Sequence, residues 1–317
     1  MEGKMKKYAF GVDIGGTTCK IGFFETNGTL LDKWEIKTNR ENNGASVLSD
    51  VAHAVEGKLE KEGISKDDVQ GIGIGVPGPV KKESIVNRCV NIGWGVVNVA
   101  EEMKNLTGLD IKVGNDANVA ALGEMWQGGA KGSKDVVLVT LGTGVGGGVI
   151  VNGKVVSGFN GAGGEIGHIT VDHDEAEQCT CGQYGCLEQY TSATGIVRMA
   201  KRKLAKCQDE TNLRNYAELT AKDVFDEAKA GDAVANVIVE EVCEILGSTL
   251  SNIACVVNPE IIVIGGGVSK AGPILIDTIQ KYYRETSFHA CKDARFAVAD
   301  LGNDAGMYGC VQMLLEE

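Results

Sequence analysis

Hydrophobic and polar positions along the first part of the chain predict three strands followed by a helix. A Gly-Gly-Thr-Thr segment and then an Asn-Gly pair divide residues 8–37 into three mainly apolar runs, and Asn-Gly is typical of tight hairpins. In residues 47–59, valine and leucine recur every four positions, which places them on one face of a helix.

The same pattern occurs a second time. Residues 135–156 again contain a strand, a glycine-rich turn, a strand, an Asn-Gly turn and a strand. Between and after the two copies, further strands are expected at 69–80, 111–116 and 260–267, and helices at 117–128, 188–206, 232–257, 271–286 and 305–315. Two copies of one β-unit, each followed by helices, predict a duplicated α/β architecture with a ligand cleft between the copies.

Composition narrows the class of protein. The chain has 317 residues with 44 glycines but only 4 prolines, and the glycines cluster, which suggests sharp turns and backbone close to a ligand. A net charge of −12 argues against nucleic acid as the main partner. The most apolar charge-free stretch, residues 136–153, is too glycine-rich for a membrane span, so no membrane partner is expected.

Localisation is predicted from the first residues and from the cysteines. The basic start reaches Asp13 before an apolar core of a signal peptide can form. Ten cysteines without an export signal indicate a reducing, cytoplasmic environment, in which thiols serve as buried small side chains or metal ligands.

The glycine-rich turns are candidate phosphate loops. Residues 142–147 satisfy G-x-G-x-x-G after a strand, but a strand follows instead of a helix and no acidic residue stands about 20 positions on, so a dinucleotide fold is excluded. The other glycine-rich turn, at 13–18, offers the same backbone amides and threonine hydroxyls, with Asp13 as a carboxylate for Mg²⁺. Either turn alone could be a hairpin without a ligand; the pair favours a nucleotide.

Asn115 and Asp116 stand between a strand and a helix. The plain interpretation is helix capping, which asparagine and aspartate often provide. The functional interpretation is that Asp116 is a general base for a hydroxyl group, as in kinases. At a helix N-terminus the carboxylate is expected to stay ionised, because the helix dipole favours the anion.

A metal site is predicted from four residues. His168, Cys179, Cys181 and Cys186 offer four nitrogen and sulfur ligands at close spacing, which is typical of a closed, structural zinc site. Unrelated buried thiols are the alternative, and His173 is a rival for the fourth ligand.

Two glutamates stand beside this predicted metal loop. Glu165 precedes His168 by three residues and Glu188 follows Cys186 by two. If the metal orders the loop, both carboxylates are held near one place, where they can accept hydrogen bonds from sugar hydroxyls. Taken alone, they could equally be surface glutamates.

Several segments together resemble the ROK family (repressors, open reading frames, kinases), and the resemblance runs from about residue 8 to the C-terminus. Among them, GAGGEIGH and CxCGxxGCLE are the most specific, whereas DxGGT also occurs in other actin-like ATPases. The segments are FGVDIGGTTCKIG, GVPGPV, NDANVAALGE, LGTGVGGGVIVNG, GAGGEIGHI, CTCGQYGCLE and VIGGG.

The resemblance implies a fold and a set of site residues. The fold would be the duplicated, ribonuclease H-like fold of actin-like ATPases, with lobes at 1–117 and 118–300 around a central cleft and a C-terminal helix at 301–317 packing back on the first lobe. Asp116 would be the catalytic base. The sugar-binding residues would be Pro77, Gly78, Asn115, Asp116, Glu165, His168 and Glu188. The residues near ATP would be Asp13, Gly15, Gly16, Thr17, Thr18, Gly142, Thr143, Gly144, Gly146, Gly265, Gly266 and Gly267.

The function implied is ATP-dependent phosphorylation of a hexose at the 6-hydroxyl, most of all glucose, with catalytic Mg²⁺ and structural Zn²⁺ and with a homodimer as the assembly. Kinases of the family for N-acetylmannosamine and other hexoses share these segments and are the alternative substrates. A sugar-sensing repressor is disfavoured by the charge and by the few residues before Asp13. A scaffold ATPase would have no need of the zinc loop.

Overall fold

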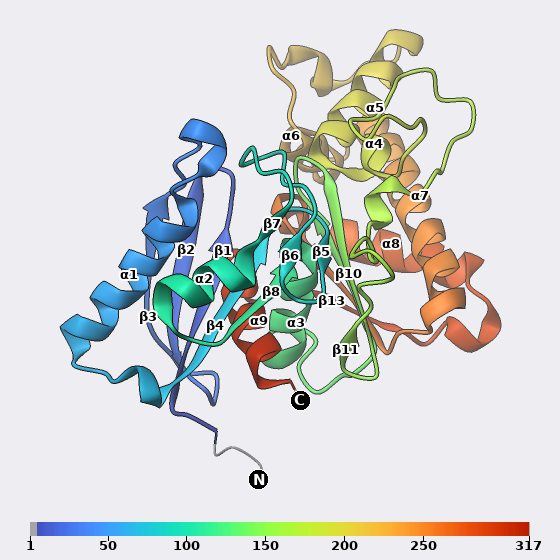
Figure 1. The fold of residues 1–317 in the computed structure, drawn as a ribbon. Coiled ribbons are helices and arrows are strands. Elements are labelled where there is room, and N and C mark those ends of the chain that lie inside the picture. Colours follow the sequence, from blue (N-terminus) through green and yellow to red (C-terminus); the bar gives the residue numbers. More distant parts are fainter. Residues whose placement is uncertain (1–4, 317) are drawn as a thin grey trace.

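Two five-stranded sheets form the centres of two lobes in the computed structural model, which describes residues 5–316 (Figure 1). The first sheet has the order β3-β2-β1-β4-β8 and the second β11-β10-β9-β12-β13. The strands of the first are β1 (Tyr8–Ile14), β2 (Thr18–Glu25), β3 (Leu30–Lys37), β4 (Val69–Val76) and β8 (Ile111–Asn115). Those of the second are β9 (Val136–Leu141), β10 (Val145–Val151), β11 (Lys154–Val155), β12 (Ile261–Gly265) and β13 (Arg295–Val298).

The two sheets repeat one topology. In each, the first three strands form an antiparallel meander, and the fourth strand then pairs in parallel with the first. The outer strand beyond it is parallel as well. The predicted duplication and the two-lobed fold are therefore confirmed.

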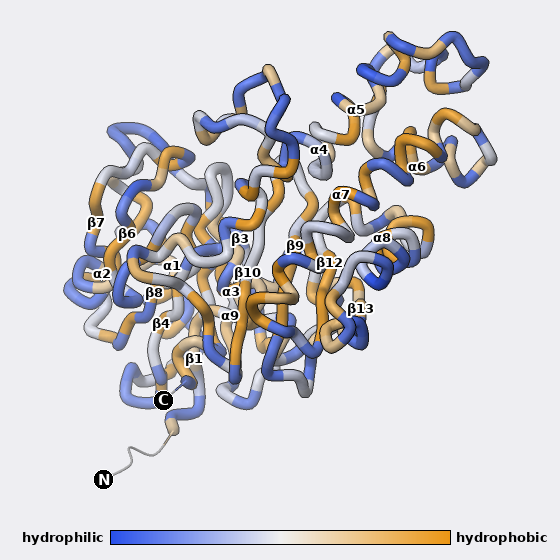
Figure 2. The backbone as a smooth tube through the Cα atoms, turned by 90° about the vertical axis from the view of Figure 1, so that its right-hand side faces the viewer, coloured by the Kyte–Doolittle hydropathy of each residue, from blue (hydrophilic) through white to orange (hydrophobic). Residues whose placement is uncertain are grey.

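Helices cover the sheets and complete two separate cores. In the first lobe, α1 (Val47–Glu62) and α2 (Val99–Thr107) bury valine, leucine and methionine side chains against β1 and β4. In the second, the long helix α7 (Ala233–Val257) packs against α8 (Pro273–Thr286) and contributes to the core over β9 and β12. Hydrophobic positions accordingly concentrate along β9, β10 and β12 in the middle of the molecule (Figure 2).

Two helices lie together between the lobes. α3 (Asp116–Gln127) and α9 (Ala305–Leu315) make the most extensive helix pair of the molecule, and α9 also lies on β1 and β4 of the first sheet. Close approach requires glycine here: a Cβ on Gly309 would lie 1.5 Å from the Val119 carbonyl oxygen, and one on Gly73 would lie 1.9 Å from that of Cys310. Part of the glycine excess therefore serves packing of α9, and not ligand binding.

Some elements differ from the sequence prediction. The helix expected over 188–206 is two helices, α4 (Glu188–Thr191) and α5 (Ala193–Lys206). Ser192 between them has an extended backbone, and its hydroxyl accepts a hydrogen bond from the Gly195 amide, so it caps α5.

Several short elements were not predicted from the sequence. They are α2, α6 (Ala221–Lys229), β13 and a small sheet of β5 (Val80–Lys81), β6 (Ile85–Val86) and β7 (Val97–Asn98). In the part of the chain that the structure describes, no helix is both long enough and apolar enough to span a membrane.

Candidate active site

The two glycine-rich turns open onto one cavity of about 650 Å³. The turn between β1 and β2 provides Asp13 and Gly15, and the turn between β9 and β10 lies opposite. α3 and α9 contribute a further part of the wall. The lining residues predicted from the sequence are Asp13, Gly15, Asp116, Gly142, Gly144, Gly146, Glu188 and Gly266.

The first turn places a carboxylate beside a cation. Gly15 donates its amide to the Thr18 carbonyl (2.9 Å), which closes the turn and makes Asp13 and Lys20 register partners on β1 and β2. Burial raises the pKa of Asp13, and the nearby charge of Lys20 opposes that rise. Asp13 also lies against α9, where a Cβ on Gly306 would lie 3.0 Å from its carboxyl carbon.

Lys20 lines the cavity and was missed in the sequence analysis. Counting alternate positions across the hairpin from Asp13 would have found it, because facing residues on two antiparallel strands point to the same side. Asn91, also missed, lines the cavity as well. Three predicted nucleotide residues are not among those that line this cavity: Gly16 and Thr17 lie in the turn, and Thr18 is the first residue of β2.

The second turn, between β9 and β10, presents backbone groups to the cavity and carries no charged side chain. Gly142 donates its amide to the Gly144 carbonyl (3.0 Å), and the Thr143 carbonyl accepts the hydroxyl of Thr194 from α5 (2.7 Å). Thr143 lines a neighbouring hollow with Cys179 and Glu188. An added Cβ on Gly144 would lie 2.7 Å from the Glu188 carboxylate, so this turn and that glutamate are in contact.

The third glycine-rich segment, residues 265–267, lies at one end of the cavity. Gly266 lines the main cavity, and Gly267 lines an adjoining pocket of about 330 Å³ between α6 and the short 3-10 helix Gly267–Ala271. That pocket is mainly apolar, with Phe225 in its wall and Lys270 at its edge. Gly265 is the last residue of β12 and lines neither space.

Asn115 and Asp116 have different roles at the start of α3: Asn115 caps the helix, and Asp116 faces the cavity. Asn115 is the N-cap: its side-chain oxygen accepts the amides of Ala117 (3.0 Å) and Asn118 (3.1 Å), and its amide nitrogen donates to the Gly78 carbonyl (3.2 Å). The capping interpretation is thus correct for Asn115, and it leaves the carboxylate of Asp116 in the cavity.

The pKa of Asp116 is raised to about 6. Its surroundings in the cleft desolvate the carboxylate and are the largest cause; a hydrogen bond from the Ala117 amide opposes the rise, and the charges of Asp13 and Glu165 add to it. The side chain nevertheless remains accessible from the open cleft. The helix dipole was expected to lower the pKa of Asp116, but the pKa is raised. Desolvation and the nearby negative charges therefore have a larger effect on this carboxylate than the helix N-terminus has.

The residues predicted to bind sugar surround Asp116 from both lobes. Pro77 and Gly78 belong to the turn after β4, which the Asn115 side chain holds. Glu165 is exposed and is close enough for its charge to act on Asp116. Glu188, at the start of α4, lies in the cavity wall.

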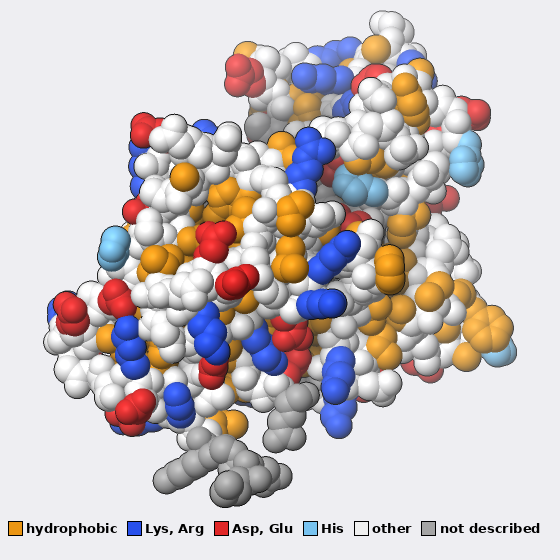
Figure 3. Space-filling model, viewed as in Figure 1, with side chains coloured by type: hydrophobic (Ala, Val, Ile, Leu, Met, Phe, Trp, Pro, Cys, Tyr) orange, Lys and Arg blue, Asp and Glu red, His pale blue; other side chains and the backbone are white. Residues whose placement is uncertain are grey.

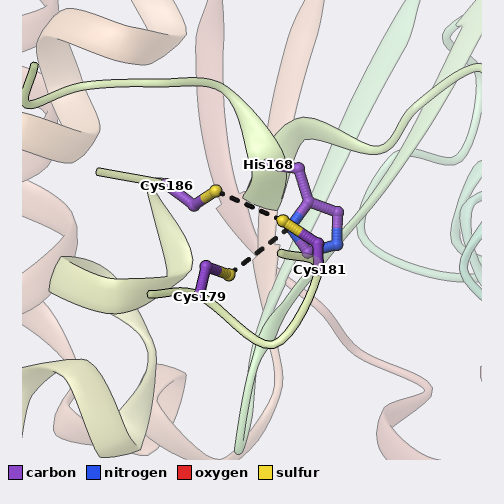
Figure 4. A group of neighbouring side chains, drawn as sticks. All are labelled: His168, Cys179, Cys181 and Cys186. Carbon is purple, nitrogen blue, oxygen red and sulfur yellow. Dashed lines mark hydrogen bonds between the residues drawn. The ribbon is translucent and has the colours of Figure 1, made fainter. Parts of the chain in front are cut away.

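The four predicted metal ligands converge (Figure 4). The ligand atoms of His168, Cys179, Cys181 and Cys186 all lie within 4.8 Å of one another, with 3.6 Å between the sulfurs of Cys181 and Cys186. Sulfurs on a tetrahedral zinc with the usual Zn–S bonds stand about 3.8 Å apart, so the donor set and its spacing fit that metal. Within residues 5–316 the histidine of the group is His168, not His173.

Glu188 connects the cysteine loop with the cleft. The thiol of Cys179 donates to the Glu188 carboxylate (3.0 Å), as does the hydroxyl of Thr180 (3.0 Å). Nδ1 of His168 faces Cys179 at 4.0 Å, which leaves the other ring nitrogen for a different partner. One loop therefore orients two of the predicted sugar residues.

Glu175 anchors the same loop and was not predicted from the sequence. Its buried carboxylate pairs with Arg198 (2.6 Å) and Arg202 (2.8 Å), one turn apart on α5, and accepts the hydroxyl of Tyr190 (2.6 Å). The guanidinium of Arg202 holds the pKa of Glu175 well below its usual range. No motif marks this residue, since only the tertiary fold brings α5 to the loop.

Two duplicated lobes with glycine-rich hairpins facing one cleft define an actin-like ATPase fold. The chain belongs to the ROK family, whose model matches residues 9–317. It is 44% identical to a glucokinase of Halalkalibacterium halodurans (96% of this chain, 93% of the relative). It is 34% identical to a glucokinase of Thermotoga maritima, with 96% of each chain covered. A ROK family glucokinase from Streptomyces griseus, solved with glucose and AMPPNP, has a TM-score of 0.75 at 32% identity, covering 96% of this chain and 98% of the other.

Proposed function

We propose that this chain is an ATP-dependent hexose kinase that phosphorylates the 6-hydroxyl of the sugar, with glucose as the preferred substrate. The observation that carries the proposal is the place of Asp116, at the start of α3, in the cavity shared by both glycine-rich hairpins and within reach of the charge of Glu165. The likeness to glucokinases over nearly the whole chain supports it.

ATP would lie along the second lobe. The backbone amides of the turns at 13–18 and 142–146 would bind the phosphates, because such turns point several N–H groups into one concavity. The adenosine would enter the adjoining pocket at Gly267 and Phe225, whose apolar wall suits a base. Mg²⁺ held by Asp13 would neutralise charge on the phosphates.

Asp116 would accept the proton of the 6-hydroxyl as that oxygen attacks the terminal phosphorus of ATP, while the bond from this phosphorus to the bridging oxygen breaks and ADP leaves. A pKa of about 6 leaves the carboxylate mostly ionised at pH 7 and makes it a stronger base than an ordinary aspartate. Lys20 and the turn amides would stabilise negative charge on the transferred phosphoryl group. Closing of the lobes over the sugar would exclude water, the competing acceptor.

The sugar would be held by residues of both lobes. Asn115 and the Pro77-Gly78 turn come from the first lobe, and Glu165, His168 and Glu188 from the second. Zn²⁺ bound by His168 and the three cysteines would be structural, since four protein ligands leave no open coordination position. Its task would be to keep the loop, and with it His168 and Glu188, in place.

A coupled assay with ATP across glucose, mannose, fructose and N-acetylmannosamine tests the substrate. We expect the highest kcat/KM with glucose. A higher value with N-acetylmannosamine would replace glucose in the proposal, and ATP hydrolysis that needs no sugar would favour a scaffold ATPase. Specific DNA binding without sugar phosphorylation would point to a sugar-sensing repressor. A homodimer in the cytoplasm belongs to the same proposal, and sedimentation of the purified chain tests the dimer.

A further inference from the structure

A buried carboxylate on α3 has no part in the function proposed above. Charged side chains are spread over the surface of the face shown in Figure 3, where water surrounds them. Glu124, about two turns after Asp116 on α3, is by contrast 0% exposed. Burial of a carboxylate is costly unless hydrogen-bond donors replace the water, so the donors around Glu124 indicate what it does.

The Glu124 carboxylate accepts three backbone amides from two separate segments. One oxygen accepts those of Gly129 (2.8 Å) and Asp300 (3.0 Å), and the other accepts that of Leu301 (2.9 Å). The carboxylate is also tightly enclosed, since a Cβ on Gly128 would lie 2.1 Å from one of its oxygens. Glu124 thus joins the C-terminal end of α3 to a segment far along the chain.

Both segments lie where the chain passes between the lobes. α3 leads from β8 of the first sheet to β9 of the second, and residues 299–304 lead from β13 of the second sheet to α9, which lies on the first. The Ala299 amide still donates to the Ile264 carbonyl of β12 (3.0 Å), so the passage begins directly after it. Glu124 therefore fastens one passage between the lobes to the other.

The segment that Glu124 holds reaches Lys20 in the catalytic cavity. Gly302 and Asn303, directly after Leu301, line that cavity together with Lys20 and Asp13. The Lys20 ammonium donates to the Asn303 carbonyl (3.1 Å), which uses one of its three N–H groups and leaves the others for a phosphate. The position of the ammonium thus depends on where the backbone at Asn303 lies.

Glu124 holds this segment more firmly than a second side-chain contact does. Lys33 on β3 pairs with Asp304 (2.6 Å), but both side chains are partly exposed, and ion pairs of that kind contribute little. Hydrogen bonds to a buried carboxylate are stronger, because no water competes for the donors. Loss of a Glu124 bond should therefore displace residues 300–303 more than loss of the ion pair.

We propose that Glu124 is a positioning residue for phosphoryl transfer. Its three hydrogen bonds fix residues 300–303, so that the Asn303 carbonyl directs the Lys20 ammonium toward the phosphates of the nucleotide. The part played by Lys20 rests on the proposed function. Glu124 is itself fully buried and touches neither nucleotide nor sugar, so it acts through Lys20.

Glu124→Gln is the informative change, because glutamine keeps the size of the side chain but has a single acceptor oxygen. Its NH₂ group would face a backbone N–H, either that of Leu301 or those of Gly129 and Asp300, so at least one bond is lost. Calorimetry on the full chain, with Mg²⁺ and a nonhydrolysable ATP analogue, measures nucleotide binding. We expect the affinity to fall about fivefold or more in Glu124→Gln, and about tenfold or more in Lys20→Met, which removes the ammonium.

The double variant Glu124→Gln/Lys20→Met separates positioning from a merely structural role. If Glu124 acts through Lys20, the double variant should bind the analogue only as weakly as Lys20→Met does. An equal further loss in the Lys20→Met background would overturn the proposal, as would unchanged binding in either single variant. Circular dichroism checks the fold of each variant, and Glu124→Asp, whose shorter side chain cannot reach all three amides, replaces Glu124→Gln in the same comparison if that variant does not fold.

Asp232→Asn is the matched control. The Asp232 carboxylate also accepts two backbone amides, those of Ala235 (2.9 Å) and Asn212 (2.8 Å), but it lines neither the catalytic cavity nor the pocket beside it. We expect this change to lower Tm and to leave the affinity for the ATP analogue as it is in the wild type. A comparable loss of affinity in this control would show that the effect of Glu124→Gln is not specific to residues 300–303.

Initial rates keep this inference distinct from the proposed function. Glu124→Gln should lower kcat/KM for ATP about fivefold or more, with little change in KM for glucose, because the sugar residues lie elsewhere in the cleft. If the wild type phosphorylates no sugar, the proposed function is wrong, whereas the binding comparison of the single and double variants still decides the role of Glu124.

Discussion

In the first sheet, the hairpin of β1 and β2 places Asp13 opposite Lys20; in the second sheet, the equivalent pair on β9 and β10 is Thr140 and Gly146. The pairing of the strands is the same in both copies, although the second turn is one residue shorter, and of these two pairs only the first presents charge to the cleft. In the second pair the Thr140 hydroxyl packs against Gly146, since a Cβ on Gly146 would lie 2.6 Å from that oxygen.

This difference between the lobes extends beyond the hairpins. The first lobe and its adjoining helix provide the carboxylates of Asp13 and Asp116, whereas the second provides amide-rich turns and a loop held by cysteines and by Glu175. The second lobe also brings a carboxylate, that of Glu188, to the cavity, so the contrast between the two copies lies in the paired hairpin positions.

Asp116→Asn should have the largest effect, because it removes the proposed base while keeping the shape of the side chain. We expect kcat with glucose to fall about 10²- to 10⁴-fold with little change in KM. Steady-state kinetics with the coupled assay measures this. Retention of near wild-type kcat would eliminate Asp116 as the base.

Asp13→Asn and Thr140→Val test the asymmetry between equivalent hairpin positions. Loss of the Asp13 charge should lower kcat about 10²-fold, because that carboxylate is the proposed Mg²⁺ partner. Thr140→Val should cost about fivefold at most, the value of a neutral hydrogen bond. The contrast between the hairpins is wrong if both variants lose activity equally, and circular dichroism of each checks that the fold is intact.

Cys181→Ser should affect the proposed zinc site and glucose binding more than ATP binding. We expect zinc content to fall below one equivalent per chain and KM for glucose to rise about tenfold or more, with a smaller change in KM for ATP. Cys255→Ser, an exposed cysteine outside the cluster, is the control. Equal metal content in both variants, measured by elemental analysis, would exclude a zinc site at Cys181.

The last prediction concerns the pH dependence of kcat/KM and its shift in Asp13→Asn. With the pKa of Asp116 raised to about 6, kcat/KM should fall about tenfold per pH unit below pH 6, because protonation removes the base. Since the charge of Asp13 contributes to the raised pKa, Asp13→Asn should move this acidic limb to lower pH. An unchanged limb in that variant would show that Asp13 does not act on the titrating group.

Turn signals and periodic apolar runs are the sequence features that made part of the fold predictable. The bounds of β1, β2 and β3 follow from two turn signals, and the group of His168 and three cysteines follows from residue types at close spacing along the chain. The break at Ser192 was missed because a cap inside an otherwise helical pattern has little weight against the residues around it. Lys20 and Glu175 were missed because their partners lie on other elements.

The sequence by itself determined the duplicated β-units, the two glycine-rich turns, the group of cysteines and the family. These depend on local spacing and on residues whose chemistry is the same in any context. Only the tertiary structure decided that Asp116 has a raised pKa and that Cys179 and Thr180 of the cysteine loop hold Glu188. It also decided that Glu124 on α3 holds residues 300–301. Desolvation, charge and long-range hydrogen bonds depend on which distant segments lie side by side, and no spacing along the chain contains that information.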